Sequence, residues 1–361
     1  MDEEIKKLSK ASHKEATSKW KKIVREYQKP SVVRASWQVV NSIGPYFALW
    51  GLWIYMSLGL SLSLWWALPP ALLGGMFLVR VFIIFHDCGH GSFYRSKKAN
   101  NYLGFISGLL TFTPYFHWRW EHSVHHATSG DLDRRGMGDI WTLTVKEYLD
   151  SSRWRKISYR LVRNPIILFL IAPIFLFLIL ERFPSKTAKP REKRSVLFMN
   201  FALVAMACGL ISIIGFLPWL VFQLAAMLMA SSCGVWMFYV QHQYEDAYWV
   251  DSEEWDYTTA AIQGSSYYEL PKVLQWFSGN IGFHHIHHLS PMIPNYNLEK
   301  CHLADSFFRD VKSMTLLGSL KSINSRLWDE DSKKMISFRE LKRQLRKEED
   351  DLDGAASRKA A

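Results

Sequence analysis

Two long stretches without a charged residue constrain the fold of this chain more than any other feature. The first runs from Ala35 to Val79 and the second covers residues 196–241. A helix needs about 20 residues to cross a hydrocarbon core of about 30 Å, so each stretch is long enough for two crossings. The pattern predicts an all-α integral-membrane protein with four transmembrane helices, at about 37–59, 63–85, 196–216 and 219–241.

Two shorter apolar runs, 102–116 and 165–181, are near or below the length that a membrane span needs. Pro165 and Pro173 interrupt the second run. We interpret both runs as interfacial or re-entrant segments of the membrane domain. The alternative is a six-span protein in which both runs cross the membrane.

Basic residues in the loops predict the orientation, because the cytoplasmic loops of membrane proteins are rich in Lys and Arg. The turns near Ser61 and Pro218 carry no charge and are expected outside the cell. The N-terminus, the region 86–164, the loop 182–194 and the C-terminal region are expected in the cytoplasm. Six spans would instead place the histidines that follow Arg119 on the outer side, apart from the other histidines.

The net charge of +11 fits either nucleic acid or an anionic membrane surface as partner. The chain has predicted spans and no nucleic-acid-binding motif, so we favour the membrane surface and expect no nucleic acid. The four cysteines have no CxxC spacing, which indicates reduced thiols. These features predict a multi-pass protein of the cell membrane.

The two ends of the chain differ from the predicted membrane domain at 35–345. Residues 1–34 are basic, and four apolar residues among them share one helical face: Trp20, Ile23, Val24 and Tyr27. This spacing favours an amphipathic helix at the membrane interface, and a solvated tail is the alternative. Residues 346–361 are charged or small and are expected to form a disordered tail.

Three short motifs and one isolated position contain ten of the 13 histidines, and nine of these ten follow the spacing of a common pattern. The motifs are HDCGH at 86–90, HSVHH at 122–126 and HHIHH at 284–288, and the isolated residue directly follows the last predicted span. Residues i and i+4 share one face of a helix, so each motif directs at least two imidazoles to the same point. The candidate metal ligands are His86, His90, His122, His125, His126, His242, His284, His287 and His288.

Imidazole ligands suit Zn, Cu, Fe or Ni. A zinc site takes four ligands, or three when it is catalytic, so eight or nine converging histidines exceed one zinc ion. Two metal ions of higher coordination number fit better, and iron is the usual choice for O2 chemistry. His117 and His285 stand beside the motifs but off their spacing, so we expect structural or orienting roles for them.

The order and spacing of the three motifs resemble the membrane fatty acid desaturase family, and most of all bacterial acyl-lipid Δ5 desaturases of the Bacillus type. The resemblance covers about residues 35–340. Further phrases that carry it are Ile84–His90, Gly138–Trp141, Gly264–Tyr268, Gly279–His284 and Pro294–Tyr296.

The resemblance implies a four-span fold capped by a cytoplasmic helical domain, in which the nine histidines hold two non-haem iron ions. It implies that the protein uses O2 to introduce a cis double bond, at Δ5, into the acyl chain of a membrane phospholipid. Ferredoxin or flavodoxin is the implied electron donor. The sequence has no HPGG haem motif, so the donor is expected to be a separate protein.

A few residues near the motifs are further candidates. Asp87 is expected to orient a ligating imidazole, or else to be a simple helix-end charge. Three tryptophans near the second motif are expected to line a tunnel for the acyl chain, or else to anchor the protein at the interface: Trp118, Trp120 and Trp141. Arg80 lies inside a predicted span, and we expect it to pair with Asp87 or to extend toward the cytoplasm.

Three other functions are alternatives to desaturation. A membrane di-iron hydroxylase has the same histidine motifs and adds oxygen to the chain. A metal transporter would place its ligands near the middle of the membrane, whereas these histidines follow the ends of spans. A zinc metalloprotease needs HExxH, and His86 is followed by Asp instead of Glu.

Overall fold

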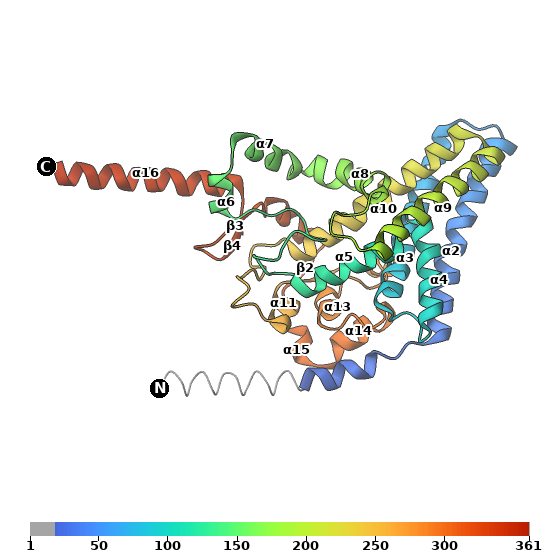
Figure 1. Ribbon diagram of the computed structural model, residues 1–361, viewed down its shortest axis with the longest axis horizontal. Coiled ribbons are helices and arrows are strands. Elements are labelled where there is room, and N and C mark those ends of the chain that lie inside the picture. Colours follow the sequence, from blue (N-terminus) through green and yellow to red (C-terminus); the bar gives the residue numbers. More distant parts are fainter. Residues whose placement is uncertain (1–18, 361) are drawn as a thin grey trace.

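The computed structural model describes residues 19–360, and helices form most of it (Figure 1). After a first helix at 19–27, the longer helices are α2 Val32–Ile54, α3 Leu68–His90, α4 Lys97–Leu110, α5 Tyr115–Thr128, α9 Pro190–Ile214, α10 Phe216–His242 and α16 Phe338–Ala360. The shorter helices are α6 Val145–Asp150, α7 Arg153–Val162, α8 Ala172–Leu178, α11 Tyr257–Gln263, α12 Lys272–Phe277, α13 His284–Leu289, α14 Asn295–Ala304 and α15 Ser306–Arg309.

Short irregular helices and four short strands complete the fold. The π and 3-10 helices are η1 Tyr55–Gly59, η2 Leu64–Ala67, η3 Ile167–Ile171, η4 Leu180–Arg182 and η5 Gly318–Asn324. Strand β1 Tyr267–Glu269 pairs in parallel with β2 Ser313–Thr315, and β3 Leu327–Asp329 pairs antiparallel with β4 Lys334–Ile336.

Three helices of the described chain are long and apolar enough to cross a membrane: Leu64–His90, Pro190–Ile214 and Phe216–His242. They correspond to the last three predicted spans and indicate association with a membrane. By the same criteria, a fourth crossing results if the pair Arg153–Val162 and Ile167–Arg182, which is bent by 63°, counts as one broken span. The same bend is also typical of a re-entrant segment, as predicted for 165–181.

The first predicted span, 37–59, is helical but is not among these three. It corresponds to α2 and η1, and α2 contains the polar residues Gln38 and Asn41 and the helix-interrupting Pro45. Its many tryptophans and tyrosines carry polar ring atoms and favour the membrane interface. For this segment, the absence of charged residues was therefore a weaker criterion for a membrane span than the hydropathy of the side chains.

Helix α3 is the central element, because α2 packs on one side of it and α10 on another. Gly75 permits the contact with α10, since a Cβ at this position would lie 2.6 Å from the carbonyl oxygen of Ala226. Tyr46, Trp50 and Trp53 of α2 are buried in the same cluster. This packing places the C-terminal ends of α3 and α10 at the same end of the bundle.

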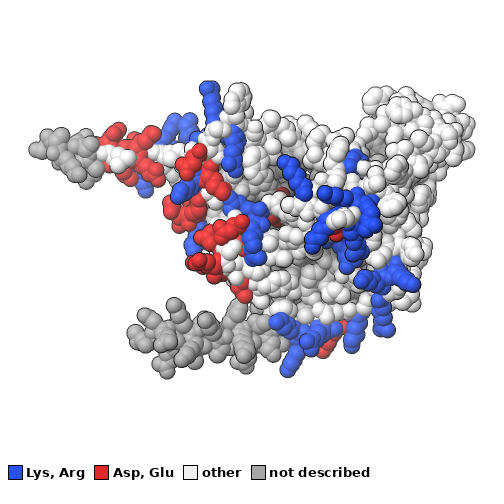
Figure 2. Space-filling model, viewed as in Figure 1, with Lys and Arg blue, Asp and Glu red and all other residues white. Residues whose placement is uncertain are grey.

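Charged side chains are distributed unevenly over the surface. Figure 2 shows Lys, Arg, Asp and Glu over the loops and short helices, whereas the end of the bundle where α9 joins α10 has no charged side chain on the visible face. The bare end is apolar and contains exposed side chains such as Ile213, Phe216 and Leu217. This distribution fits a bundle that is embedded in lipid at one end.

Both ends of the chain differ from the sequence-based expectation. In the helix at 19–27, Trp20 and Val24 are buried against the protein with Ile286 and Leu289, so the apolar face predicted for the membrane interface contacts the protein instead. Residues 1–18 of that predicted segment lie outside the described residues. Helix α16 continues to Ala360 and projects from the body (Figure 1), so the chain is helical over 346–360, where we expected disorder.

Candidate metal centre

The histidine motifs lie at the ends of helices that meet on one side of the bundle. The first motif ends α3, the second lies on α5, the third begins α13, and His242 is the last residue of α10. The i, i+4 spacing on α3 brings the rings of His86 and His90 to 4.7 Å between their centroids. Segments far apart in the sequence therefore direct their imidazoles toward one region.

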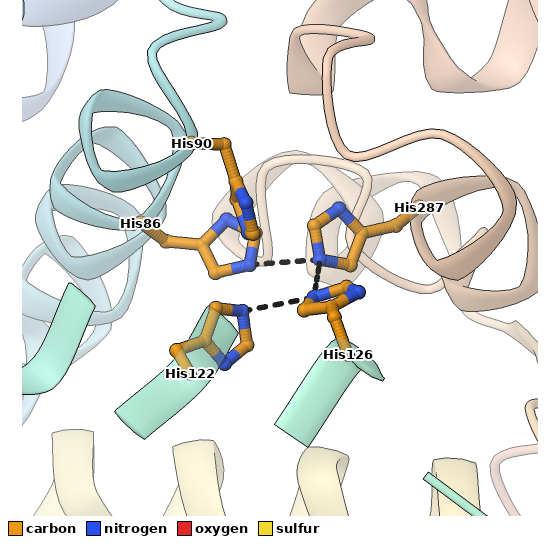
Figure 3. A group of neighbouring side chains, drawn as sticks. All are labelled: His86, His90, His122, His126 and His287. Atoms are coloured by element: carbon orange, nitrogen blue, oxygen red, sulfur yellow. Dashed lines mark hydrogen bonds between the residues drawn. The ribbon is translucent and has the colours of Figure 1, made fainter. Parts of the chain in front are cut away.

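Five histidines form a first group, shown in Figure 3: His86, His90, His122, His126 and His287. One ring nitrogen of each lies within 4.8 Å of the others. The Nε2 of His287 is 3.0 Å from that of His86 and 2.9 Å from that of His126. Two nitrogens bound at right angles to one metal ion at about 2.1 Å lie about 3 Å apart, so the observed spacing fits ligands of one ion.

Three histidines, His125, His242 and His288, form a second group whose nitrogens also lie within 4.8 Å of one another. His284 adjoins this group, because its Nε2 is 2.9 Å from the Nε2 of His242. The two groups are neighbours, since the rings of His126 and His288 stack with centroids 4.2 Å apart. The structure thus brings all nine predicted histidines together and divides them between two adjacent positions.

The protonation state of these rings fits a cation. Burial, reinforced by the neighbouring imidazoles, lowers the pKa of five of them well below the ordinary value: His122, His126, His284, His287 and His288. They are neutral at pH 7 and retain a nitrogen lone pair. Among the residues that the structure describes, the buried Nε2 atoms of His90, His125 and His288 have no hydrogen-bond partner. Buried polar atoms are normally paired, so the unpaired nitrogen in the first group and the two in the second fit metal binding at both positions.

Carboxylates hold the outer nitrogens of two candidate ligands. Asp87 is 3.1 Å from Nδ1 of His86, and its other oxygen accepts hydrogen bonds from Asn295. Asp139 is 2.6 Å from Nδ1 of His125. Such contacts set the tautomer and direct Nε2 toward a metal. The geometry fits the orienting role predicted for Asp87.

We did not predict Asp139 as a site residue. The only sequence signal for it is its position in the phrase Gly138–Trp141, 14 residues after His125. A loop carries it, and the same carboxylate accepts a hydrogen bond from the backbone N–H of Gly136. Only the folded loop brings this side chain to the histidine.

The two histidines predicted outside the ligand set lie away from both groups. The Nε2 of His117 accepts a hydrogen bond from the backbone N–H of Ser185, which ties α5 to the loop before α9. His285 is buried, and its Nε2 lies 3.1 Å from Nδ1 of His302 and 3.0 Å from the carbonyl oxygen of Phe308. These contacts are consistent with structural roles.

An apolar cavity of about 510 Å³ leads from the histidines into the bundle. One histidine of each motif forms part of its wall: His86, His122 and His284. Trp118 also lines it and stacks on His122, with ring centroids 4.4 Å apart. The remaining wall comes mainly from apolar residues of α3, α8 and α10. A volume of this size is typical of a site for a small ligand or a lipid chain.

The cavity has both exposed and buried wall residues. Phe175 and Leu180 line it and are 49% and 50% exposed, and the exposed Gly138 lines it as well. Exposed wall residues therefore occur on α8 and η4 and in the loop that carries Asp139. Four other wall residues are buried: Leu78, Thr111, Met227 and Ser231.

Three predicted residues lie elsewhere. Trp120 and Trp141 are not part of the cavity wall, and Trp141 is 37% exposed with its ring against Tyr159. Arg80 does not pair with Asp87. Its guanidinium lies 3.9 Å from the ring centroid of Trp276 and donates a hydrogen bond to the carbonyl of that residue. The shared helix face suggested a pair, but the guanidinium contacts Trp276 from a distant segment instead.

Comparisons with known proteins agree with this geometry. Residues 63–312 match the family described as fatty acid desaturase. The chain is 48% identical over 321 residues to a fatty acid desaturase of Bacillus subtilis, which covers 89% of this chain and 90% of that protein. It is 27% identical over 291 residues to an sn-1 acyl-lipid omega-3 desaturase (ferredoxin) of Synechocystis, covering 75% of this chain and 74% of that protein. It is 28% identical over 258 residues to an sn-1 oleoyl-lipid 12-desaturase of Picosynechococcus, covering 67% and 70%.

Proposed function

The chain belongs to the fatty acid desaturase family, and from this premise we propose that it introduces a cis Δ5 double bond into the acyl chain of a membrane phospholipid, with O2 as oxidant and two iron ions as cofactor. One observation carries the proposal. His86, His122 and His284 come from three different motifs and lie in the wall of one apolar cavity. A chain in this cavity has its methylene groups directly beside the candidate metal ligands.

The shape of the cavity supports a reaction near the ester end of the chain. A phospholipid headgroup stays at the membrane surface, so the chain enters with its methyl end first. Gly138 is an exposed wall residue beside the second motif, because a Cβ there would lie 3.1 Å from the Cβ of His125. With entry beside Gly138, few carbons separate the ester from the histidines, and the rest of the chain lies between α3, α8 and α10. This arrangement supports Δ5.

The donor set supports two iron ions. The first group would hold one ion with five histidines, and the second group with His284 would hold the other. An unactivated methylene offers no acidic proton, so metal ions held by the histidines would activate O2, which is the oxidant. The protein binds the chain, excludes water with an apolar wall, and orients His86 and His125 through Asp87 and Asp139. Two hydrogens of the chain, two protons and two electrons from the donor convert O2 to two waters.

We propose ferredoxin or flavodoxin as the separate electron donor. The names of two cyanobacterial relatives include ferredoxin. Loops rich in Lys and Arg, such as 182–194, favour an acidic partner. The same loops favour four spans, with α2 as the first, and a cytoplasmic metal centre in the cell membrane.

Expression in a bacterial host that lacks this activity tests the proposal. The double bonds of the membrane acyl chains are mapped by mass spectrometry, with His284→Ala as the inactive variant and His302→Gln as a matched histidine change outside the cavity. We expect a new Δ5 double bond with wild type and with His302→Gln, and none with His284→Ala. A hydroxylated chain would move the protein to the hydroxylases. Purified wild type without bound iron would refute the di-iron centre.

A further inference from the structure

Gly234 on α10 lines the apolar cavity and has no evident structural need to be glycine. Its backbone is helical, and a Cβ built on it would have nothing within 4 Å among the described residues. A glycine inside a helix destabilises that helix relative to alanine. The position therefore carries an energetic cost that the packing of the protein does not explain.

Other glycines of the bundle lie where close packing leaves no room for a side chain. At Gly75, a Cβ would lie 2.6 Å from the carbonyl oxygen of Ala226, and at Gly108 it would lie 2.5 Å from that of Thr113. Both glycines permit close contact between segments. Gly234 faces the cavity instead, so the absence of a side chain at this position leaves open space in the cavity.

Gly234 lies midway along the α10 wall of the cavity. This wall runs from Gln241, which directly precedes His242, to the buried Met227. The 14 residues between them correspond to about 21 Å, and Gly234 is seven residues, or about 10 Å, from either end. Ala230 also lines the cavity, only three residues or about 4.5 Å from Met227.

We propose that Gly234 is a specificity-determining residue, which keeps the inner half of the cavity open and thereby sets how many carbons are accepted on the methyl side of the double bond. The inference rests on the proposed function, in which the acyl chain occupies this cavity. The inner half holds the chain beyond the reacting carbons. A side chain at Gly234 obstructs the cavity midway, whereas one at Ala230 shortens only its end.

The test counts the carbons between the new double bond and the methyl end of each product chain. Three variants are compared with wild type in the expression host: Gly234→Leu, Ala230→Leu and Gly209→Leu. Gly209 is the matched control, because it is exposed on α9, also has nothing within 4 Å of a built Cβ among the described residues, and does not line the cavity.

We expect the carbon count to fall by about half in Gly234→Leu and by about a fifth in Ala230→Leu, in proportion to the length of wall that each substitution closes. Gly209→Leu should match wild type. An unchanged count in Gly234→Leu, while wild type forms its double bond, would overturn the inference and leave the proposed function intact. A wild type without product would refute the proposed function itself.

Two further measurements separate obstruction from misfolding. Gly234→Ala should melt at a higher temperature than wild type, because alanine favours the helix and nothing obstructs its methyl group. If Gly234→Leu gives no product on the host's own chains, shorter fatty acids are supplied in the medium. Product from short chains supports the inference, whereas failure at every length in a variant with wild-type melting temperature and metal content overturns it.

Discussion

Replacing Asp139 by asparagine should weaken the second metal position without unfolding the protein. The Asp139 carboxylate lies 2.6 Å from Nδ1 of His125, and its second oxygen accepts the backbone N–H of Gly136. Asparagine has the same shape but no charge, and its amide nitrogen cannot accept that N–H. Loss of such an orienting carboxylate typically lowers metal affinity by about 10–100-fold, which is about 1.4–2.8 kcal/mol.

The assay titrates metal-loaded protein with a chelator and measures the metal that remains per chain. Two-step release is expected for wild type, and in Asp139→Asn one step should shift to chelator concentrations about 10–100-fold lower. Asp133→Asn is the control, because Asp133 lies in the same loop and is exposed, and its carboxylate accepts the backbone N–H of Ser252 without touching a histidine. Wild-type release from Asp139→Asn would show that this carboxylate does not orient a ligand.

Three other predictions follow from the packing of the site. Trp118→Leu removes the ring that stacks on His122. Because such stacking contributes about 1 kcal/mol, the double-bond yield should fall about fivefold while the metal content stays unchanged. An unchanged yield would contradict the role of Trp118 in the cavity wall. Gly104→Ala should lower the free energy of unfolding by about 1–3 kcal/mol, because a Cβ there overlaps the ring of Tyr115. The measurement is the melting temperature in detergent. Gly44→Ala should not be destabilising, since nothing among the described residues lies within 4 Å of a Cβ built at Gly44. Removing metal with a chelator should lower the melting temperature, since a ligand at 1,000 times its Kd stabilises the folded protein by about 4 kcal/mol. Adding iron(II) should restore the melting temperature. Equal melting temperatures with and without metal would argue against a buried metal centre at the histidines.

Local spacing made the histidines predictable. The i, i+4 pairs in the motifs and the position of His242 at the end of a span are visible without any tertiary information. The contact between Asp87 and His86 was also predictable, because the two residues are adjacent in the chain. Asp139 was not, since a loop carries it and its distance from His125 along the chain implies no contact.

The membrane segments were predictable to the extent that length and charge determine them. Three of the four predicted spans meet the requirements of length and hydropathy, but α2 does not, because its polar and aromatic residues lower its hydropathy. The helix at 19–27 shows another limit. Its amphipathic pattern was correct, but the pattern alone does not state whether Trp20 contacts lipid or protein.

The sequence by itself determined which side chains are candidate ligands and which segments are apolar enough to lie in a membrane. Both properties depend on residues within a few helical turns of one another. Only the tertiary structure decided which histidines lie in the same group, which residues line the cavity, and that Gly234 faces it. These features depend on the relative placement of distant segments: His86 and His287 are 201 residues apart in the chain, and packing of α3, α5, α10 and α13 brings their nitrogens to 3.0 Å.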